Sequence, residues 1–253
     1  MSLLTERDRQ TVQSHLAGLT HDVTLLFFTQ TIGAPETVTI ARQVVEEVAS
    51  LSDRITVEEV NLILDKERSE QFGIDRIPGI ALLRDGADTR MRFLGAPAGY
   101  EFSSLVEAIL LAGTDDSGLT DDSKRVIAEM ATAPIEIKVF VTPTCPHCPR
   151  AVTLAHRMAV ESPNISATCV EASEFHDLSR QYRVTGVPKT VSSGGAEILG
   201  ALPEEQFVRG VLEGQNFSRR ILPNDGRRHE RGSVNAANSG RRPLAVSRDR
   251  RPH

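Results

Sequence analysis

Cys145 and Cys148 are separated by two residues, Pro146 and His147, and this spacing is the strongest chemical signal in the sequence. The apolar, β-branched run before them predicts a strand, and the run Ala151–Ala159 after them has helical spacing. Both thiols therefore fall where a strand meets the N-terminus of a helix. The helix dipole and its unpaired N–H groups lower a thiol pKa from about 8.5 and produce a nucleophilic thiolate. The second cysteine can attack a mixed disulfide formed by the first, so the pair predicts a redox centre.

The same spacing also occurs in metal sites and in chemically inert pairs. A structural zinc ion needs four ligands, and the sequence offers only one further cysteine, Cys169, with His147, His156 and His176 scattered. We therefore expect no metal. Cys169 lies in a strand-like run, where we expect it to be a small buried hydrophobic residue.

Length and composition predict two small domains and a tail. The chain has 253 residues, more than one domain of about 100 residues needs. The first ten residues have no apolar signal core, and no apolar run approaches the roughly 18 residues of a membrane span. Three cysteines do not make the disulfide framework of a small secreted protein. We expect a cytoplasmic protein that does not contact membranes.

The last 36 residues, 218–253, differ in charge from the rest. They hold ten arginines and three carboxylates, a net charge of +7, and because the whole chain carries −5, residues 1–217 carry −12. This segment has too little apolar content to offset the cost of ordering, about 1–2 kcal/mol per residue, so a disordered basic tail is predicted. Its arginines are not interleaved with aromatic residues, which favours a solvated tail over a nucleic-acid contact.

Three segments recur in the same order, which indicates one fold used twice. The matching pairs are Thr29–Pro35 with Thr142–Cys148, Gly73–Pro78 with Tyr182–Pro188, and Leu94–Pro97 with Leu199–Leu202, at offsets of 113, 110 and 105 residues. Each copy has the pattern of helix, strand, helix, strand, helix, two strands and helix. The opening helices are expected from Thr5 to Leu16 and from Thr120 to Ala131, with the two threonines as N-caps.

With these motifs, residues 1 to about 217 resemble the double-thioredoxin-fold protein disulfide oxidoreductases, which are glutaredoxin-like proteins of archaea and some bacteria. The same residues are similar to the N-terminal module of the alkyl hydroperoxide reductase flavoprotein. The segment Thr142–Pro149 looks like the C-terminal active site of that family, and Gly186–Pro188 looks like its cis-proline loop. The expected fold class is α/β, with two tandem thioredoxin-like domains at 1–117 and 118–217, each a mixed central sheet flanked by helices, and the tail at 218–253.

The resemblance also implies roles for individual residues. Cys145 would be the attacking thiol and Cys148 the resolving thiol, with Pro146 and His147 tuning their reactivity. Thr144, Val187 and Pro188 would face the substrate, and the Val187–Pro188 bond would be cis, which costs only about 0.5–1 kcal/mol before proline. Val139 stands six positions before Cys145, where thioredoxins keep a buried carboxylate, so Glu171 and Glu174 are candidate substitute proton carriers or solvated side chains.

The first copy departs from the family pattern, because Ile32–Pro35 occupies the place of a second Cys-x-x-Cys and contains no sulfur. That copy cannot exchange disulfides. It either serves as a packing platform for the second copy or, because it keeps Pro78, binds an extended peptide or a partner.

The sequence therefore predicts a thiol–disulfide oxidoreductase that reduces or forms disulfides in proteins, with a peroxiredoxin among the candidate substrates. It has no Gly-rich dinucleotide fingerprint, so we expect no bound cofactor beyond the Cys145–Cys148 disulfide, and recharging by a separate thioredoxin-reductase-like flavoprotein. The alternative is a redox-sensing binding module whose thiol-free copy recruits a client.

Overall fold

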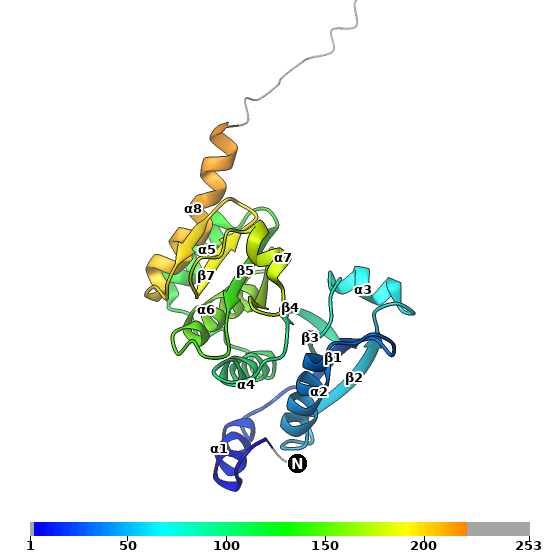
Figure 1. The fold of residues 1–253 in the computed structure, drawn as a ribbon. Helices are drawn as coiled ribbons and strands as arrows, with labels where there is room; N and C mark the ends of the chain where they lie inside the picture. The colour runs from blue at the N-terminus through cyan, green and yellow to red at the C-terminus, as the bar shows by residue number, and fades with distance from the viewer. Residues whose placement is uncertain (1–2, 222–253) are drawn as a thin grey trace, which may run out of the picture. The chain divides into compact units, whose positions relative to one another are not determined.

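The computed structural model describes residues 3–221, and from residue 215 onward it describes the backbone alone. The first copy of the fold contains eight elements: α1 (Glu6–Leu16), β1 (Val23–Thr29), α2 (Glu36–Ala49), β2 (Ile55–Asn61), α3 (Lys66–Phe72), β3 (Gly79–Arg84), β4 (Ala87–Leu94) and α4 (Glu101–Ala112). The second copy repeats their order: α5 (Asp121–Met130), β5 (Ile135–Val141), α6 (Cys148–Glu161), β6 (Ile165–Glu171), α7 (His176–Gln181), β7 (Lys189–Ser192), β8 (Glu197–Leu199) and α8 (Glu204–Ile221). The predicted pattern of helices and strands is confirmed in both copies (Figure 1).

Both opening helices begin at the threonines that the sequence marks as N-caps. The Thr5 hydroxyl accepts a hydrogen bond from the Asp8 amide, and the Asp8 carboxylate accepts one from the Thr5 amide in return. Thr120 likewise accepts a hydrogen bond from the Ser123 amide. These bonds satisfy amides that the first turn leaves unpaired, so each copy starts at a sequence-specified residue.

Within residues 3–221 the strands form one eight-stranded sheet in the order β2-β1-β3-β4-β6-β5-β7-β8. Each copy contributes four neighbouring strands, and the parallel pairing of β4 with β6 joins the two sets, from Met91 opposite Ala167 to Leu94 opposite Val170. The predicted pair of sheets is thus continuous, because each set covers an edge of the other that would otherwise expose unpaired backbone groups. Residues 1–222 form one compact unit.

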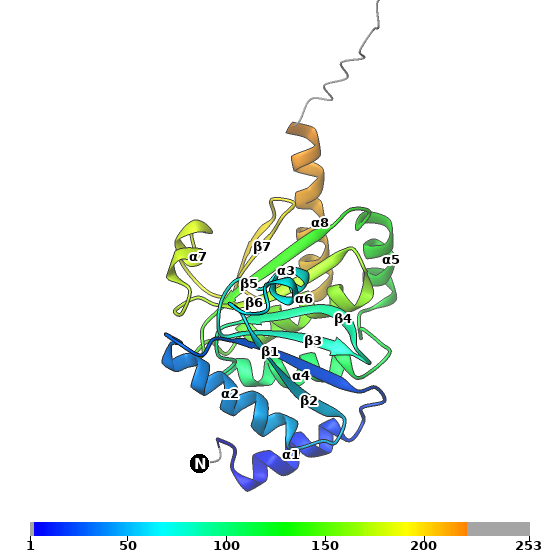
Figure 2. The same ribbon diagram turned by 90° about the vertical axis from the view of Figure 1, so that its right-hand side faces the viewer.

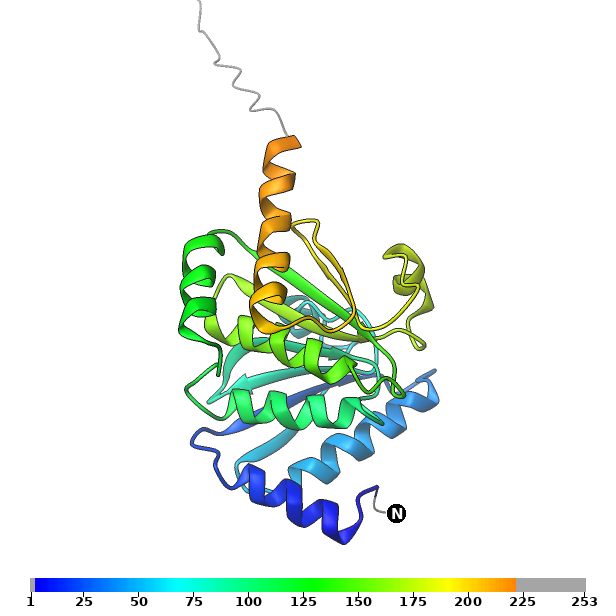
Figure 3. The ribbon, with the colours of Figure 1, turned by 90° about the vertical axis from the view of Figure 1, so that its left-hand side faces the viewer.

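The helices divide unequally between the two faces of the sheet. One core cluster packs α1, α2, α4, α5, α6 and α8 against one face, and a smaller cluster packs α3 and α7 against the other. Figures 2 and 3 show these two faces from opposite sides. Because successive strand residues point to opposite faces, Phe93 and Val139 join the larger core, whereas Leu94 and Phe140 join the smaller one.

Helix α8 extends to Ile221, four residues into the segment that the sequence assigns to the tail. Extending an existing helix adds one hydrogen bond per ordered residue, without the cost of nucleation. The rest of the predicted tail lies outside the described residues. The domain boundaries at 117 and 217 stay a prediction.

Candidate active site

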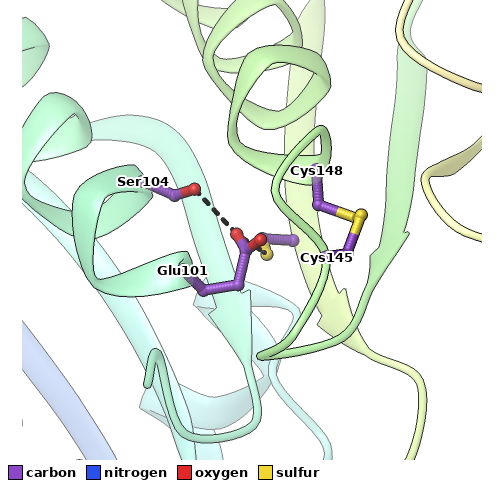
Figure 4. The surroundings of a disulfide bond; sticks show 5 residues. Glu101, Ser104, Cys145 and Cys148 are labelled. Carbon is purple, nitrogen blue, oxygen red and sulfur yellow. Dashed lines mark hydrogen bonds between the residues drawn. A yellow bond between two sulfur atoms is a disulfide. The ribbon is translucent and has the colours of Figure 1, made fainter. Parts of the chain in front are cut away.

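The two cysteines lie at the junction of β5 and α6 and are joined by a disulfide, with their Cα atoms 5.5 Å apart (Figure 4). Cys148 is the first residue of α6, and its amide donates a 3.4 Å hydrogen bond to the Cys145 carbonyl. Cys145 retains 9% of its surface exposed, whereas Cys148 is fully buried. An outside sulfur atom can therefore reach Cys145 and not Cys148.

The N-terminus of α6 is left open to a negative charge. The N-cap residue, His147, makes no side-chain cap hydrogen bond, and the first turn contains no acidic residue. Pro149 in that turn lacks an N–H, but the other first-turn amides are without helical partners and carry the positive end of the dipole. Thr144, Pro146 and His147 are exposed around Cys145. This terminus is thus suited to stabilise a thiolate.

The loop before β7 lies beside the cysteine segment. β7 runs antiparallel to β5 with Lys189 opposite Phe140, so the residues before Lys189 continue alongside the residues after Phe140. The Val187–Pro188 bond is cis, as predicted, and so is Ile77–Pro78 in the first copy. Pro188 is buried and Val187 is partly buried. Within the described part of the chain, no hydrogen bond engages the amide or carbonyl of Val187.

A buried carboxylate, Glu101, reaches the site from the other copy of the fold. It lies in the first turn of α4 and is 1% exposed. Its Oε2 atom accepts a 2.7 Å hydrogen bond from the Ser104 hydroxyl and a 3.6 Å contact from the Cys169 thiol. Its Oε1 atom is buried and has no hydrogen-bond partner among the described residues. Figure 4 shows Glu101 on the side of the disulfide that faces α4.

Burial raises the pKa of Glu101 to about 7, because a carboxylate loses solvation in this environment. The hydrogen bonds from Ser104 and Cys169 oppose that effect, and the charge of Glu171 adds to it. Burial, together with the neighbouring Glu101, also raises the pKa of the Cys169 thiol well above its usual value. Glu101 is therefore a group beside the disulfide that exchanges a proton near neutral pH, whereas Cys169 stays a thiol.

The start of α4 is held against the cysteine loop by its backbone. The Tyr100 amide donates a 2.9 Å hydrogen bond to the Pro143 carbonyl, two residues before Cys145. Gly99 precedes it with φ of +61°, and a Cβ atom there would lie 2.3 Å from the Pro143 oxygen. Only glycine fits this left-handed position at so close an approach. The first copy therefore fixes Glu101 relative to the cysteines of the second.

The two carboxylates that the sequence offers as proton carriers have other roles. Glu171 is buried and accepts hydrogen bonds from Ser173 and from the Glu174 amide, which closes the loop after β6. Glu174 accepts a 2.7 Å hydrogen bond from the Ala96 amide, so it ties that loop to the first copy. Both hold the backbone, and neither is simply solvated. Cys169 is buried as predicted.

The sequence pattern did not reveal Glu101, because a proton carrier was expected near the cysteines in the same copy. An acidic residue in a first helical turn is ordinarily explained by the helix dipole. The available signal was the company of Glu101: it opens the largely apolar helix Glu101–Ala112 and follows a glycine two residues before. Its distance of 44 positions from Cys145 hid the relation.

Metal binding and membrane insertion find no support in the described part of the chain. No group of three or more His, Cys, Asp or Glu side chains in residues 3–221 is placed to hold a metal ion. No helix in the same range has the length and apolar character to cross a membrane.

Comparisons with known proteins agree with this geometry. Residues 135–213 match the family described as thioredoxin domain. The second copy is a thioredoxin domain. Among solved structures, the whole described fold is similar to the N-terminal domain of alkylhydroperoxide reductase AhpF from Enterococcus faecalis, with a TM-score of 0.76 and 29% identity over 82% of this chain and 99% of that one. It is similar to a protein disulfide oxidoreductase from Aeropyrum pernix, with a TM-score of 0.75 and 29% identity over 83% and 94% of the two chains.

Sequence relatives include the alkyl hydroperoxide reductase flavoprotein AhpF of Pseudomonas aeruginosa, 32% identical over 67% of this chain and 30% of the relative. A protein named NADH dehydrogenase from Ferdinandcohnia aciditolerans is 29% identical over 69% of this chain and 31% of the relative. The chain thus spans about a third of the length of these curated relatives. The predicted resemblance, the thioredoxin-like fold and the class of activity, a disulfide oxidoreductase with a dithiol, are confirmed.

Proposed function

We propose that this protein transfers two electrons to protein disulfides through Cys145 and Cys148, with a peroxiredoxin as the substrate and a thioredoxin-reductase-like flavoprotein as the electron donor. The observation that carries the proposal is the pairing of a reachable sulfur, Cys145, with a buried one, Cys148, at an uncapped helix N-terminus. We place the reaction in the cytoplasm, where reductants keep protein thiols reduced.

The reaction proceeds in two exchange steps. The Cys145 thiolate attacks one sulfur of the substrate disulfide, forming a mixed disulfide and releasing the other substrate sulfur as a thiolate that takes up a proton. The Cys148 thiol then loses its proton, and its thiolate attacks the Cys145 sulfur. This step forms the Cys145–Cys148 disulfide and releases the second substrate thiol. Two electrons pass to the substrate, and the flavoprotein restores the dithiol by the reverse exchange.

The loop at Val187 and Pro188 is proposed to hold the substrate in place. The free amide and carbonyl of Val187 can pair with an extended peptide, as an additional strand does at a sheet edge. Pro188 brings no N–H to compete for that pairing. Thr144 is exposed beside Cys145 and lines the approach to it. Pro146 and His147 are exposed between the two sulfurs, where they would tune the reactivity of Cys145.

Glu101 is proposed to take the proton from the Cys148 thiol in the second step. A buried thiol cannot give its proton to bulk water, and a carboxyl group with a pKa of about 7 both accepts and returns a proton at neutral pH. The partnerless Oε1 atom is the acceptor site that the other hydrogen bonds leave free. The missing carboxylate of the second copy is thereby supplied by the first.

The relatives support the choice of partners. One protein that matches this chain is named as an alkyl hydroperoxide reductase, and one similar structure is named as a protein disulfide oxidoreductase. A hydroperoxide-reducing system requires a disulfide to be reduced again in each cycle, which is the reaction that the dithiol performs. The alternative, a redox-sensing module that recruits a client, would use the same disulfide without turnover.

Insulin reduction by dithiothreitol separates turnover from sensing. We expect the wild-type protein to accelerate the precipitation of the insulin B chain and Cys145→Ser to lose the acceleration, because the attacking sulfur is gone. Cys148→Ser should form a mixed disulfide with the substrate that persists in a non-reducing gel, because the resolving sulfur is gone. Full activity in Cys145→Ser would reject the proposal. A wild-type protein without activity would favour the sensor.

A further inference from the structure

A separate cavity lies on the face of the sheet that carries α3 and α7. It has a volume of about 280 Å³ and is lined by residues of β4, β5 and β6 between these two helices. The cysteines belong to the other face, because Val139 and Cys169 point toward α6, whereas their strand neighbours Lys138 and Thr168 point into this cavity. Nothing in the redox mechanism uses it.

The inner groups of the cavity are cationic, and the anionic groups lie at its rim. The side chain of Arg92 is 9% exposed and that of Lys138 is 15% exposed. The rim carboxylate Glu136 is 53% exposed, and Asp75, on the opposite side, is exposed as well. Charges within a protein act through a lower dielectric than charges at its surface, so the two cations dominate the potential at the floor. This is a positive site in a body that carries −12.

The polar groups of the floor retain hydrogen-bonding capacity. Arg92 donates from Nε to the Phe72 carbonyl, from one terminal nitrogen to the Met91 carbonyl and from the other to Asp88. A guanidinium has five N–H groups, so two are left over. The Thr168 hydroxyl has no hydrogen-bond partner in the described part of the chain, although the residue is 9% exposed. Buried donors without partners point to a missing acceptor.

The remaining lining shows what kind of acceptor fits. Ile74, Leu94 and Leu178 supply apolar surface, and the Tyr182 ring lies 6.0 Å from the Lys138 ammonium group. A bare inorganic ion would leave this surface and much of the volume unfilled. We propose that the cavity binds a small organic anion, whose carboxylate or phosphate oxygens are held by Arg92, Lys138 and Thr168 and whose apolar part packs between α3 and α7.

The geometry of the donors agrees with this ligand class. A guanidinium presents its N–H groups as a planar fork that matches two oxygens of a carboxylate or phosphate. The lysine ammonium and the threonine hydroxyl add donors from the neighbouring strands β5 and β6. The volume is close to the lower end of ligand pockets, which begin at about 300 Å³, so the ligand is small.

Binding is tested on the full chain in its disulfide form by following amide signals in NMR titrations. The probes are phenyl phosphate and benzoate, with benzyl alcohol as the uncharged match and inorganic phosphate as the anion without an apolar part. We expect saturable shifts at Arg92, Thr168 and Tyr182 with phenyl phosphate or benzoate, weaker ones with inorganic phosphate, and none with benzyl alcohol. Equal binding of benzyl alcohol, or no saturable shift with either organic anion, overturns the proposal.

Three variants locate the binding. Lys138→Gln should weaken the binding of the organic anion by about tenfold, the loss expected for one charge-assisted hydrogen bond. Thr168→Val keeps the shape of the side chain, removes only the hydroxyl and should weaken binding several-fold. Lys124→Gln removes a cation of α5 that pairs with Asp116 and should leave binding unchanged. Equal affinity in wild type and Thr168→Val contradicts the proposal even where Lys138→Gln fails to fold.

Discussion

The two copies of the fold differ most at the position where each could carry a reactive group. Ile32 stands where the second copy has Cys145, and it is 88% exposed, whereas Cys145 is 9% exposed and linked to Cys148. The helix that follows Ile32 has Glu36 in its first turn, and the helix that follows Cys145 has no acidic residue there. An acidic residue at this position disfavours a thiolate. The first copy has therefore lost both the sulfur and the electrostatic setting for it.

What the first copy retains is the frame and one side chain. It keeps the order of its strands, its place in the common sheet and the cis bond before Pro78. Through α4 it delivers Glu101 beneath the cysteines of the second copy, fixed by the contact of Gly99 and Tyr100 with Pro143. The comparison teaches that a copy without thiols is still part of the redox site, because the buried carboxyl group comes from it.

The largest expected effect is the loss of that carboxyl group. Glu101→Gln should lower the rate of insulin reduction near neutral pH by on the order of 100-fold, the low end for a positioned proton carrier. The variant should also lose the change in rate that wild type shows near pH 7, the pKa of Glu101. Rates measured from pH 5 to 9 give both results. An unchanged pH profile would show that the cysteines exchange protons by another route.

The same variant has a predicted effect on stability, with a defined sign. The folded protein keeps the Glu101 proton up to about pH 7, whereas an ordinary Glu releases it near pH 4.5. Wild-type stability therefore falls by up to about 3 kcal/mol as the pH rises from 4.5 to 7, and the glutamine variant escapes this loss. Urea unfolding of the disulfide form at several pH values measures it.

His156 on α6 provides the matched control for this measurement. Burial lowers its pKa to about 4, and neither ring nitrogen has a hydrogen-bond partner in residues 3–221. The unfolded chain binds a proton there below about pH 6.5 and the folded chain does not, so this group makes stability fall as the pH drops from 6.5 to 4. His156→Leu should remove that acid-side loss and keep the loss due to Glu101. Parallel profiles in the two variants would contradict both assignments.

A smaller effect is expected from the contact that joins the copies, and a second glycine serves as its control. In Gly99→Ala the new Cβ would lie 2.3 Å from the Pro143 oxygen, in addition to the strain at φ of +61°. In Gly33→Ala, at φ of +71°, the nearest atom is 3.7 Å away, so only the strain applies. We expect a loss of about 1 kcal/mol for Gly33→Ala and about 2–4 kcal/mol for Gly99→Ala.

Activity distinguishes the two glycine variants further. Gly99→Ala should also slow insulin reduction, because α4 and Glu101 move away from the cysteine loop, and Gly33→Ala should not. Thermal unfolding and the insulin assay on the same samples supply both quantities. Similar losses of stability and activity in the two variants would mean that the contact with Pro143 does not position Glu101.

How much of this could be predicted depends on whether the signal is local. The dithiol, both threonine caps and the order of elements follow from short segments, because periodicity and capping act within a few residues. The repeat of Pro78 and Pro188 was enough to predict the cis bond at Val187–Pro188. Glu101 was not predictable in this way, because its role comes from the packing of α4 against a loop more than 40 positions away. The same is true of Arg92, Lys138 and Thr168, which three different strands bring together.

The smallest expected effect concerns the exposed residue that replaced the cysteine. If the first copy is a platform, Ile32→Ser should change the free energy of unfolding by no more than about 0.5 kcal/mol, because the side chain is 88% exposed. The kcat and KM for insulin should then match those of wild type. We expect this outcome, because the contribution of the first copy passes through Glu101. A several-fold rise in KM for insulin, without a change for a small aromatic disulfide, would show instead that the first copy binds the polypeptide.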